Sequence, residues 1–369
     1  MPFNFKERIG QIHRKLESAR DGSIELDGVL RGVRDVTLQD YLSHTAEFAA
    51  GCKDGVFDMA QLYGELGINP NVMTTKQLIS LDQDSRWLVP EIFRDAIRKG
   101  LRTSPFYPKI IAASETVAQP QVNLPYFDLS DAEPTDLEEA ETISKGTVTY
   151  GNKTVEIGKQ GIGISITDEA LQYSSINLLT LFLQDVGVKL GQKLNNTAID
   201  VLINGDQDDL SENAAVIGVT NITTGLYYPD ILRVWIRASR LGRAYTAIIA
   251  GEAMANQILN LAEFKDKQAG TTQQSLVVNE TLPSQSQLFV SAQVASNTAI
   301  FLDPSRALVQ LTSAPLKVEA DRIVNKQINE AYTSITTGFA NIFRDARVIV
   351  DQTQLITDAD FPSYMTPTL

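Results

Sequence analysis

Histidine and cysteine are scarce in this sequence of 369 residues, which holds two histidines, His13 and His44, and one cysteine, Cys52. Hydrolases of the Ser-His-Asp and Cys-His kinds need a histidine beside the nucleophile, and zinc sites are built mostly from cysteine and histidine. A single cysteine forms no internal disulfide, so we interpret Cys52 as a small buried hydrophobic residue. We therefore expect no catalytic residues, no metal ligands and no cofactor.

Glycine-rich nucleotide-binding signatures are also missing. The sequence contains no GxxxxGK[ST] phosphate loop. The stretch GIGIS at residues 161–165 has the spacing of a dinucleotide loop, but Ile166 stands where the third glycine belongs. Because these glycines lie between strand-like residues, a bulge or a close backbone approach is the better interpretation.

Basic residues and long apolar runs are both in short supply. The 32 basic residues are outnumbered by 45 acidic ones, which gives a net charge of −13 and the wrong sign for a protein that grips phosphates. No run approaches the roughly 20 apolar residues of a membrane helix, and the N-terminus has no signal-peptide pattern. We expect a protein that stays in the cytoplasm where it is made, and the 43% hydrophobic content suffices for two or three packed domains.

The first hundred residues predict helices. Apolar residues at helical spacing up to residue 48 are interrupted by glycines, which predicts short helices within an extended arm over residues 1–80. We expect this arm to be retained and ordered. Residues 82–101 predict an amphipathic helix, with Pro90 in its first turn and Gly100 at its end. Its predicted buried face carries Ile92, Phe93 and Ile97.

Residues 110–166 change to short β-like runs. VTY, Gly151-Asn152 and TVEI follow one another, which predicts a long two-stranded hairpin. Its first half is acidic without a single lysine or arginine, and a hairpin alone is marginal in water. We expect it to project and to lie on its own domain or on a neighbouring subunit. The acidic residues are Asp128, Asp131, Glu133, Asp136, Glu138, Glu139 and Glu141.

Residues 176–203 form the strongest element, a predicted helix about 42 Å long that Asn204-Gly205 should end. Gly187 and Gly191, one turn apart, suggest that something packs closely against them. The apolar stripe of this helix comprises Ile176, Leu179, Leu183, Val186, Leu190, Leu194, Ala198 and Val201.

The remainder predicts a second compact unit of mixed type. A helix at 229–241 opened by Pro229, a strand at 244–250 and a helix at 252–264 are followed by short strands as far as Leu311. Residues 316–350 show β-branched alternation on both sides of Gly338, as expected of paired strands meeting at a turn. The chain as a whole therefore reads as α+β.

The order of these elements resembles the Hong Kong 97 type fold of tailed-phage major capsid proteins, shared in outline with encapsulin shells. The passages that carry the resemblance are residues 158–206 (GKQGIGISITDEALQYSSINLLTLFLQDVGVKLGQKLNNTAIDVLINGD), 228–261 and 319–351. The first is similar to the passage from the E-loop into the spine helix, the second to the A-domain, and the third to the closing P-domain strands. The resemblance covers roughly residues 80–351, and the order of the passages carries more weight than any one of them.

This resemblance implies a structural major capsid protein that assembles as hexamers and pentamers into an icosahedral head around phage double-stranded DNA. It implies a virion protein assembled in the host cytoplasm, with portal and scaffold or decoration proteins as partners, without sequence-specific DNA binding and without a membrane. The implied domains are an N-terminal arm (1–80), a P-domain (81–113 and 169–205), an E-loop hairpin (114–168), an A-domain (206–315), returning P-domain strands (316–352) and a C-terminal tail (353–369).

Charge complementarity motivates one prediction about the contact between subunits. The acidic residues Asp136, Glu138 and Glu139 of one copy are expected to meet Arg94, Arg98 and Lys99 on the 82–101 helix of a neighbour. Some relatives crosslink a lysine to an asparagine, but no motif here selects a pair.

Two other functions stay open at this point. An encapsulin-like compartment would share the fold and enclose a cargo protein in place of a genome. An α+β enzyme would have to work through the carboxylates of residues 128–141, for which the sequence offers no nucleophile and base arrangement.

Overall fold

The computed structural model describes residues 88–103, 105–119, 121–128, 147–205, 213–261 and 286–365, the short pieces 63–64 and 69–74, and single positions 12, 14, 16, 38 and 42. The chain divides into two compact units, each assembled from three stretches of sequence. Unit 1 comprises residues 1–105, 159–193 and 314–336, and unit 2 comprises 106–158, 194–313 and 337–369. Helices and strands occur in both units, which confirms the α+β class.

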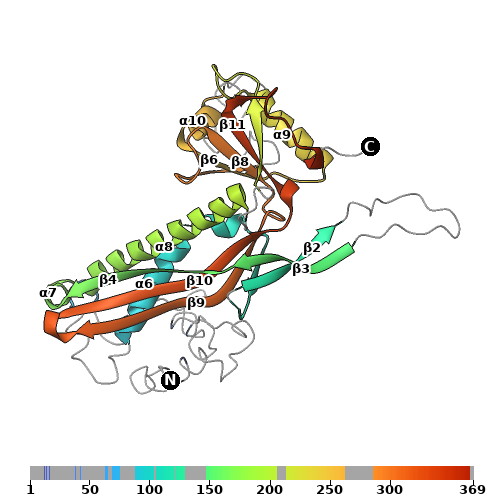
Figure 1. Ribbon diagram of the computed structural model, residues 1–369. Helices are drawn as coiled ribbons and strands as arrows, with labels where there is room; N and C mark the ends of the chain where they lie inside the picture. The colour runs from blue at the N-terminus through green and yellow to red at the C-terminus, as the bar shows by residue number, and fades with distance from the viewer. Residues whose placement is uncertain are drawn as a thin grey trace, which may run out of the picture. The chain divides into compact units, whose positions relative to one another are not determined.

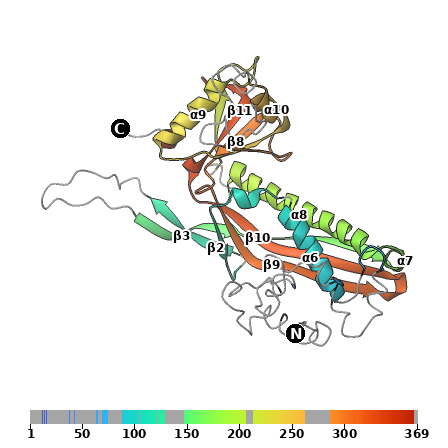
Figure 2. The same cartoon turned by 180° about the vertical axis from the view of Figure 1, so that it is seen from behind.

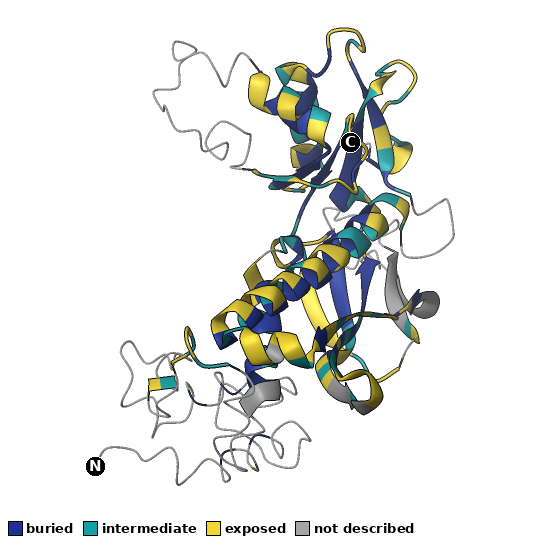
Figure 3. Ribbon diagram, turned by 90° about the vertical axis from the view of Figure 1, so that its left-hand side faces the viewer, coloured by how far each residue is buried: buried dark blue, intermediate teal, exposed yellow. Residues whose placement is uncertain are grey.

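Two helices organise unit 1. Helix α6 (Leu88–Thr103) buries Ile92 and Ile97, as its spacing predicts. Helix α8 (Ile176–Asn204) has the predicted bounds to within one residue, and Figure 3 shows it as a long helix with one buried and one exposed side. A short helix, α7 (Asp168–Tyr173), precedes it and is capped by the hydroxyl of Thr167, which accepts from the Ala170 N–H at 3.2 Å. The buried stripe of α8 comprises Ile176, Leu179, Leu183, Val186, Leu190, Leu194 and Ala198, whereas Val201 is only half-buried.

Glycines allow α6 and α8 to cross backbone to backbone. A Cβ atom on Gly187 would stand 2.0 Å from the Ile97 carbonyl oxygen, and one on Gly100 would stand 2.0 Å from the Gln184 carbonyl oxygen. The close packing predicted at Gly187 is thus confirmed, and its partner is α6. The prediction that Gly100 ends the 82–101 helix is wrong, because α6 continues to Thr103 and Gly100 serves the crossing instead of a cap.

A four-stranded sheet has the strand order β1 (Ala113–Thr116), β9 (Leu308–Ile323), β10 (Ile328–Asn341) and β4 (Gly158–Thr167). Figures 1 and 2 show β9 and β10 as long neighbouring strands with β4 beside them. The predicted turn at Gly338 is wrong, because the chain turns earlier, through Val324–Lys326 and Gln327 with φ 54°. Gly338 lies within β10, where a side chain would meet the carbonyl oxygen of Glu156 at 3.0 Å.

The glycines of the GIGIS stretch lie in β4 and face the neighbouring strand closely. A Cβ atom on Gly161 would come within 2.8 Å of the Thr333 carbonyl oxygen, and one on Gly163 would come within 2.8 Å of the Tyr332 ring. The prediction of a close backbone approach is therefore confirmed. Larger side chains would push β4 away from β10.

The predicted hairpin exists, but its turn is not at Gly151-Asn152. Strand β3 (Thr147–Glu156) runs through both residues and pairs antiparallel with β2 (Gln121–Asp128). The register shifts between Leu124, opposite Lys153, and Pro125, opposite Tyr150, so Gly151 and Asn152 form a bulge. Strand β4, also within residues 114–168, belongs to the four-stranded sheet. The E-loop boundaries remain a prediction.

The core of unit 2 is a five-stranded mixed sheet in the order β5 (Ala215–Val219), β11 (Arg347–Leu355), β8 (Thr298–Leu302), β6 (Ala247–Ala250) and β7 (Gln287–Val290). Strands β5 and β11 are parallel, as are β6 and β7, whereas β8 is antiparallel to both of its neighbours. Helices α9 (Tyr228–Arg240) and α10 (Glu252–Asn260) pack on the sheet through Ile231, Val234, Met254 and Ile258. These two helices were predicted, while β6 is shorter than the predicted 244–250 strand.

Short 3₁₀ helices complete the regular structure at Tyr107–Lys109, Val324–Lys326, Arg344–Ala346 and Ser363–Met365. Buried polar groups connect these pieces within unit 2. Arg347 is fully buried and donates from Nη1 to the Val201 carbonyl oxygen of α8 at 3.1 Å, and the Tyr107 N–H donates to Oδ1 of Asn195 at 3.0 Å. Within the described part of the chain, no helix has the length and apolar character required to cross a membrane.

Candidate assembly surfaces

The predicted contact residues lie partly within the described structure. On α6, Arg94 and Arg98 are half-buried, and each interacts with other groups of the chain, while Lys99 is exposed. Asp136, Glu138 and Glu139 lie outside the described residues, as do the other acidic positions from 131 to 141. The pairing between the two groups therefore stays a prediction. Of the three cations, Lys99 is the one most open to an incoming partner.

An apolar patch on the first turns of α8 was not predicted. Leu178, Leu181 and Phe182 are 44%, 61% and 55% exposed, and their i, i+3, i+4 spacing puts them on one face of the helix. The same face continues through Asp185, whose Oδ2 accepts from the Lys189 Nζ at 3.1 Å in an exposed ion pair. Clustered exposed apolar residues mark surfaces that another macromolecule covers.

The sequence held a signal for this patch. The stripe used to predict α8 accounts for one face of the helix, but Leu178, Leu181 and Phe182 lie off that stripe and are also large and apolar. A helix that is apolar on two sides needs two partners. The structure supplies one of them, because Ile176 packs with Ile92 of α6.

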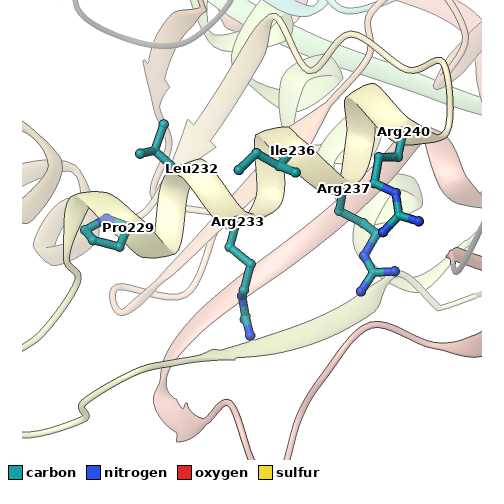
Figure 4. Close-up of a pocket in the computed structure, with 6 residues that line it drawn as sticks. All are labelled: Pro229, Leu232, Arg233, Ile236, Arg237 and Arg240. Carbon is teal, nitrogen blue, oxygen red and sulfur yellow. The ribbon is translucent and has the colours of Figure 1, made fainter.

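A second surface is a groove of about 410 Å³ along α9. It is lined by Pro229, Leu232, Arg233, Ile236, Arg237 and Arg240. Figure 4 shows all six side chains on this one helix, with the three arginine side chains extending to the same side of it. The i, i+4, i+7 spacing of the arginines and the i, i+3, i+7 spacing of the apolar residues place a basic strip beside an apolar strip.

The start of α9 is fixed by its sequence. Pro229 occupies the first turn, and the buried carboxylate of Asp230 accepts from the Tyr227 N–H at 3.1 Å and from the Thr220 hydroxyl at 2.5 Å. The first bond satisfies a donor that a helix start leaves without an intrahelical partner, and the second ties the helix start to the residue that follows β5. The lining residues therefore stand on a rigid element whose opposite face, with Ile231 and Val234, is buried in the core.

The three arginines of the groove differ in how strongly other groups of the fold hold their side chains. Arg233 donates from Nη2 to the Gly218 carbonyl oxygen at 2.9 Å, and its Nη1 lies 3.7 Å from Oδ1 of Asp360. Burial lowers the pKa of Arg233, an effect opposed by the nearby carboxylate of Asp360. Arg237 stacks its guanidinium over the ring of Phe361 at 4.8 Å, and Arg240 is exposed. Arg233 thus holds the fold together, while Arg237 and Arg240 present charge outward.

The described residues contain no group of three His, Cys, Asp or Glu side chains that could hold a metal ion. Their exposed chemistry consists instead of an apolar patch on α8 and an amphipathic, basic groove on α9. Both features are typical of a protein that binds other macromolecular surfaces.

Residues 151–351 match the protein family described as Phage capsid protein. The match covers more than half of the 369 residues, and the protein belongs to this family. Capsid proteins are structural components of the virion that form homo-oligomeric shells. Membership confirms the expectation that the protein is not an enzyme, and the alternative of an enzyme working through residues 128–141 is set aside.

Several solved structures align with this chain at low identity. A virus-like particle from Pyrococcus furiosus aligns with 10% identity over 70% of this chain and 96% of the other, with a TM-score of 0.47. A structure from Mycobacterium phage Adephagia aligns with 13% identity over 68% and 90%, with a TM-score of 0.46. The capsid of a native GTA particle aligns with 13% identity over 69% and 89%, with a TM-score of 0.48. With TM-scores below 0.5, these similarities stand as observations only. A comparison with curated proteins found no match.

Proposed function

We propose that this phage capsid protein is the major capsid protein of a tailed double-stranded-DNA phage with the Hong Kong 97 type fold. In this proposal it assembles in the host cytoplasm, as hexamers and pentamers, into an icosahedral head that encloses the genome. The observation that carries the proposal is the family match over residues 151–351, which spans β4, the long helix α8, the five-stranded sheet and the closing strands β9 and β10.

The proposal assigns each segment a part of the shell subunit. Residues 1–80 form the N-terminal arm, 114–168 the E-loop, and 206–315 the A-domain. The P-domain comprises 81–113 and 169–205, and its strands return at 316–352, before a C-terminal tail at 353–369. The crossing of α6 and α8 supports this division, because two helices in direct backbone contact give one body of the subunit a rigid spine.

A shell subunit works by geometry. One chain must make several nonidentical contacts, each weak enough to be corrected during assembly and together strong enough to hold a closed particle. The apolar patch on α8 and the basic groove on α9 offer separate surfaces for such contacts. A net charge of −13 suits a lumen through which DNA moves without sticking, so we propose that the DNA is enclosed without sequence-specific binding.

The acidic stretch is proposed to contact a neighbouring subunit. Asp136, Glu138 and Glu139 of one copy would lie against Arg94, Arg98 and Lys99 on α6 of the next. The exposure of Lys99 supports this arrangement, and opposite charges at the edge of an interface steer and orient association. Portal protein and scaffold or decoration proteins would be further partners of the shell.

Electron microscopy of purified particles tests the proposed function. The wild-type protein should form closed shells, and Asp136→Lys, Glu138→Lys and Glu139→Lys together should reduce shell yield at least about tenfold. The matched control carries the same charge change at exposed acids elsewhere, Glu115→Lys, Glu252→Lys and Asp358→Lys, and should assemble normally. A wild-type protein that remains monomeric or dimeric would refute the shell function, while normal particles from the first triple variant would refute the contact.

An encapsulin-like compartment is the remaining alternative, and the content of the particles separates it from a phage head. Particles from infected or producing cells should contain double-stranded DNA, detected as nuclease-protected nucleic acid. Particles filled with a co-purifying protein and devoid of DNA would favour the compartment.

A further inference from the structure

The groove on α9 is chemically unlike the protein that carries it. The protein has a net charge of −13, yet this helix gathers Arg233, Arg237 and Arg240 within two turns. Beside them lie Leu232 and Ile236, and Ile236 is 52% exposed. The complementary occupant of a basic strip beside apolar side chains carries both carboxylates and an apolar side chain.

A peptide fits this groove better than nucleic acid does. A phosphate backbone would pair with the arginines but would leave Leu232 and Ile236 facing polar sugar and phosphate groups. An extended acidic segment with a leucine satisfies both strips. Arg237 is already held over the ring of Phe361 at 4.8 Å, so little side-chain freedom is lost when a carboxylate arrives.

The chain itself contains such a segment, which begins at the last residue of β2. Residues 128–133 read DLSDAE, with Asp128, Asp131 and Glu133 as carboxylates and Leu129 between them. Fully extended, six residues reach up to about 20 Å, while the rise from Arg233 to Arg240 along α9 is about 10 Å. The segment is long enough to follow the groove, and its charges are separate from the 136–139 group assigned to α6 above.

We propose that the α9 groove of one copy receives residues 128–133 of a neighbouring copy. In an extended chain Leu129, Asp131 and Glu133 share one face, so the carboxylates of Asp131 and Glu133 pair with Arg237 and Arg240, and Leu129 packs on Leu232 and Ile236. This contact rests on the proposed shell function, and it gives that function a second intersubunit contact, between residues 128–133 of one copy and α9 of the next. It connects a β2–β3 hairpin on one subunit to α9 on the next.

Charge reversal on both sides of the contact tests it in the full chain. Arg237→Glu with Arg240→Glu should lower the yield of closed shells at least about tenfold, and adding Asp131→Lys and Glu133→Lys should restore most of it. Arg233 is left unchanged because it is bonded to Gly218 and Asp360. The matched control is Arg306→Glu with Lys326→Glu, two exposed cations elsewhere, which should assemble as the wild type does. Far-UV circular dichroism verifies that each variant folds.

The outcomes separate the alternatives. Normal shells from the Arg237→Glu, Arg240→Glu variant would overturn the proposal. The proposal would also fail if lysines at Asp136, Glu138 and Glu139, in place of lysines within residues 128–133, restored the shell yield of that variant. Normal shells that fail to retain DNA would identify nucleic acid as the occupant and would also overturn it. Failure of the wild type and of the control to form shells would instead refute the proposed function.

Disulfide trapping tests the same contact without depending on shells. Asp131→Cys and Arg240→Cys are placed on two differently tagged copies that both carry Cys52→Ser, and the mixture is oxidised with copper phenanthroline. A covalent dimer containing both tags supports the contact. The absence of a mixed dimer would overturn the proposal, as would a chain carrying both cysteines that crosslinks only to itself.

Discussion

The crossing of α6 and α8 predicts a strong response to one added methyl group. In Gly187→Ala the new Cβ would stand 2.0 Å from the Ile97 carbonyl oxygen, 2.9 Å from its carbon and 2.9 Å from the Leu101 nitrogen. All three are backbone atoms, so no side chain can rotate away, and the helices must separate by about 1 Å to reach ordinary contact. That separation loosens the packing of fully buried Ile97 and Leu183.

Two opposing contributions set the expected change in the free energy of unfolding. Overpacking of a well-packed contact costs up to about 3 kcal/mol, and replacing glycine by alanine inside a helix returns about 1 kcal/mol. We therefore expect Gly187→Ala to lower the free energy of unfolding by about 2 kcal/mol and Tm by about 3 °C. Urea unfolding and thermal melting of the unassembled subunit, followed by circular dichroism, measure both quantities.

Gly191→Ala is the matched control on the same helix. Its nearest neighbour would be the Pro105 ring, at 3.2 Å, a contact that a displacement of a few tenths of an ångström relieves. The helix-propensity gain should offset the small strain, so this variant should unfold within about 0.5 kcal/mol of the wild type. If Gly187→Ala is as stable as Gly191→Ala, the backbone crossing does not constrain the position and the reasoning fails.

Two further predictions concern the polar network of unit 2. Arg243 donates from Nε and Nη2 to the two carboxylate oxygens of Asp345, both at 2.8 Å, and the side chains are 11% and 22% exposed. Arg243→Ala should lower the free energy of unfolding by about 2 kcal/mol, and a double-mutant cycle with Asp345→Ala should give a coupling near 1 kcal/mol; full additivity would contradict the pairing. Burial, with the Asp345 charge second, raises the pKa of Tyr245, whose hydroxyl donates to the Asp345 carbonyl oxygen. Because the folded phenol stays protonated above the ordinary value of 10.0 while the unfolded phenol ionises, this contribution to stability is present below about pH 10 and is lost above it. The free energy of unfolding measured with urea should fall more steeply between about pH 9 and 11 in the wild type than in Tyr245→Phe. Equal slopes in the two proteins would refute the assignment of this pH dependence to Tyr245.

Long elements were predictable from the sequence because their local signals are redundant. Helix α8 has an apolar residue at nearly every helical step over eight turns. It ends at Asn204, and Gly205 follows with φ 82°. Helix α9 carries Pro229 and Asp230 in its first turn, where a helix start favours these residues. In both cases the hydrophobic period and the terminal residues agree, so neither depends on distant parts of the chain.

Glycine was the residue whose role the sequence left ambiguous. Gly100, Gly151 and Gly338 all suggested chain reversals or ends, and none of them makes one. Gly100 admits the α8 backbone, Gly151 lies in a bulge of β3, and Gly338 admits the Glu156 carbonyl in β10. A missing side chain serves a turn and a close contact equally well, and only the position of the other strand or helix distinguishes the two.

For the candidate surfaces, too, the sequence showed part of the answer and the tertiary structure decided the rest. The acidic and basic residues that suggested an intersubunit contact were visible in the sequence, and so was the i, i+4, i+7 spacing of the α9 arginines. The sequence did not show whether the fold leaves a given cation exposed for a partner. Arg94, Arg98 and Arg233 have the same side chain as Arg240, but the fold engages the first three, whereas the Arg240 side chain is exposed.

The sequence by itself therefore determined helices α6, α8, α9 and α10, the α+β class, the poverty of residues for common active sites and the resemblance to phage capsid proteins that the family match confirmed. These properties follow from composition and from hydrophobic periodicities that repeat within a single helix or strand. The tertiary structure decided which glycines carry a crossing, which strands pair, and which apolar and basic residues of α8 and α9 stay exposed. Those depend on contacts between residues far apart in the chain, and no local pattern encodes which partner will cover a given face.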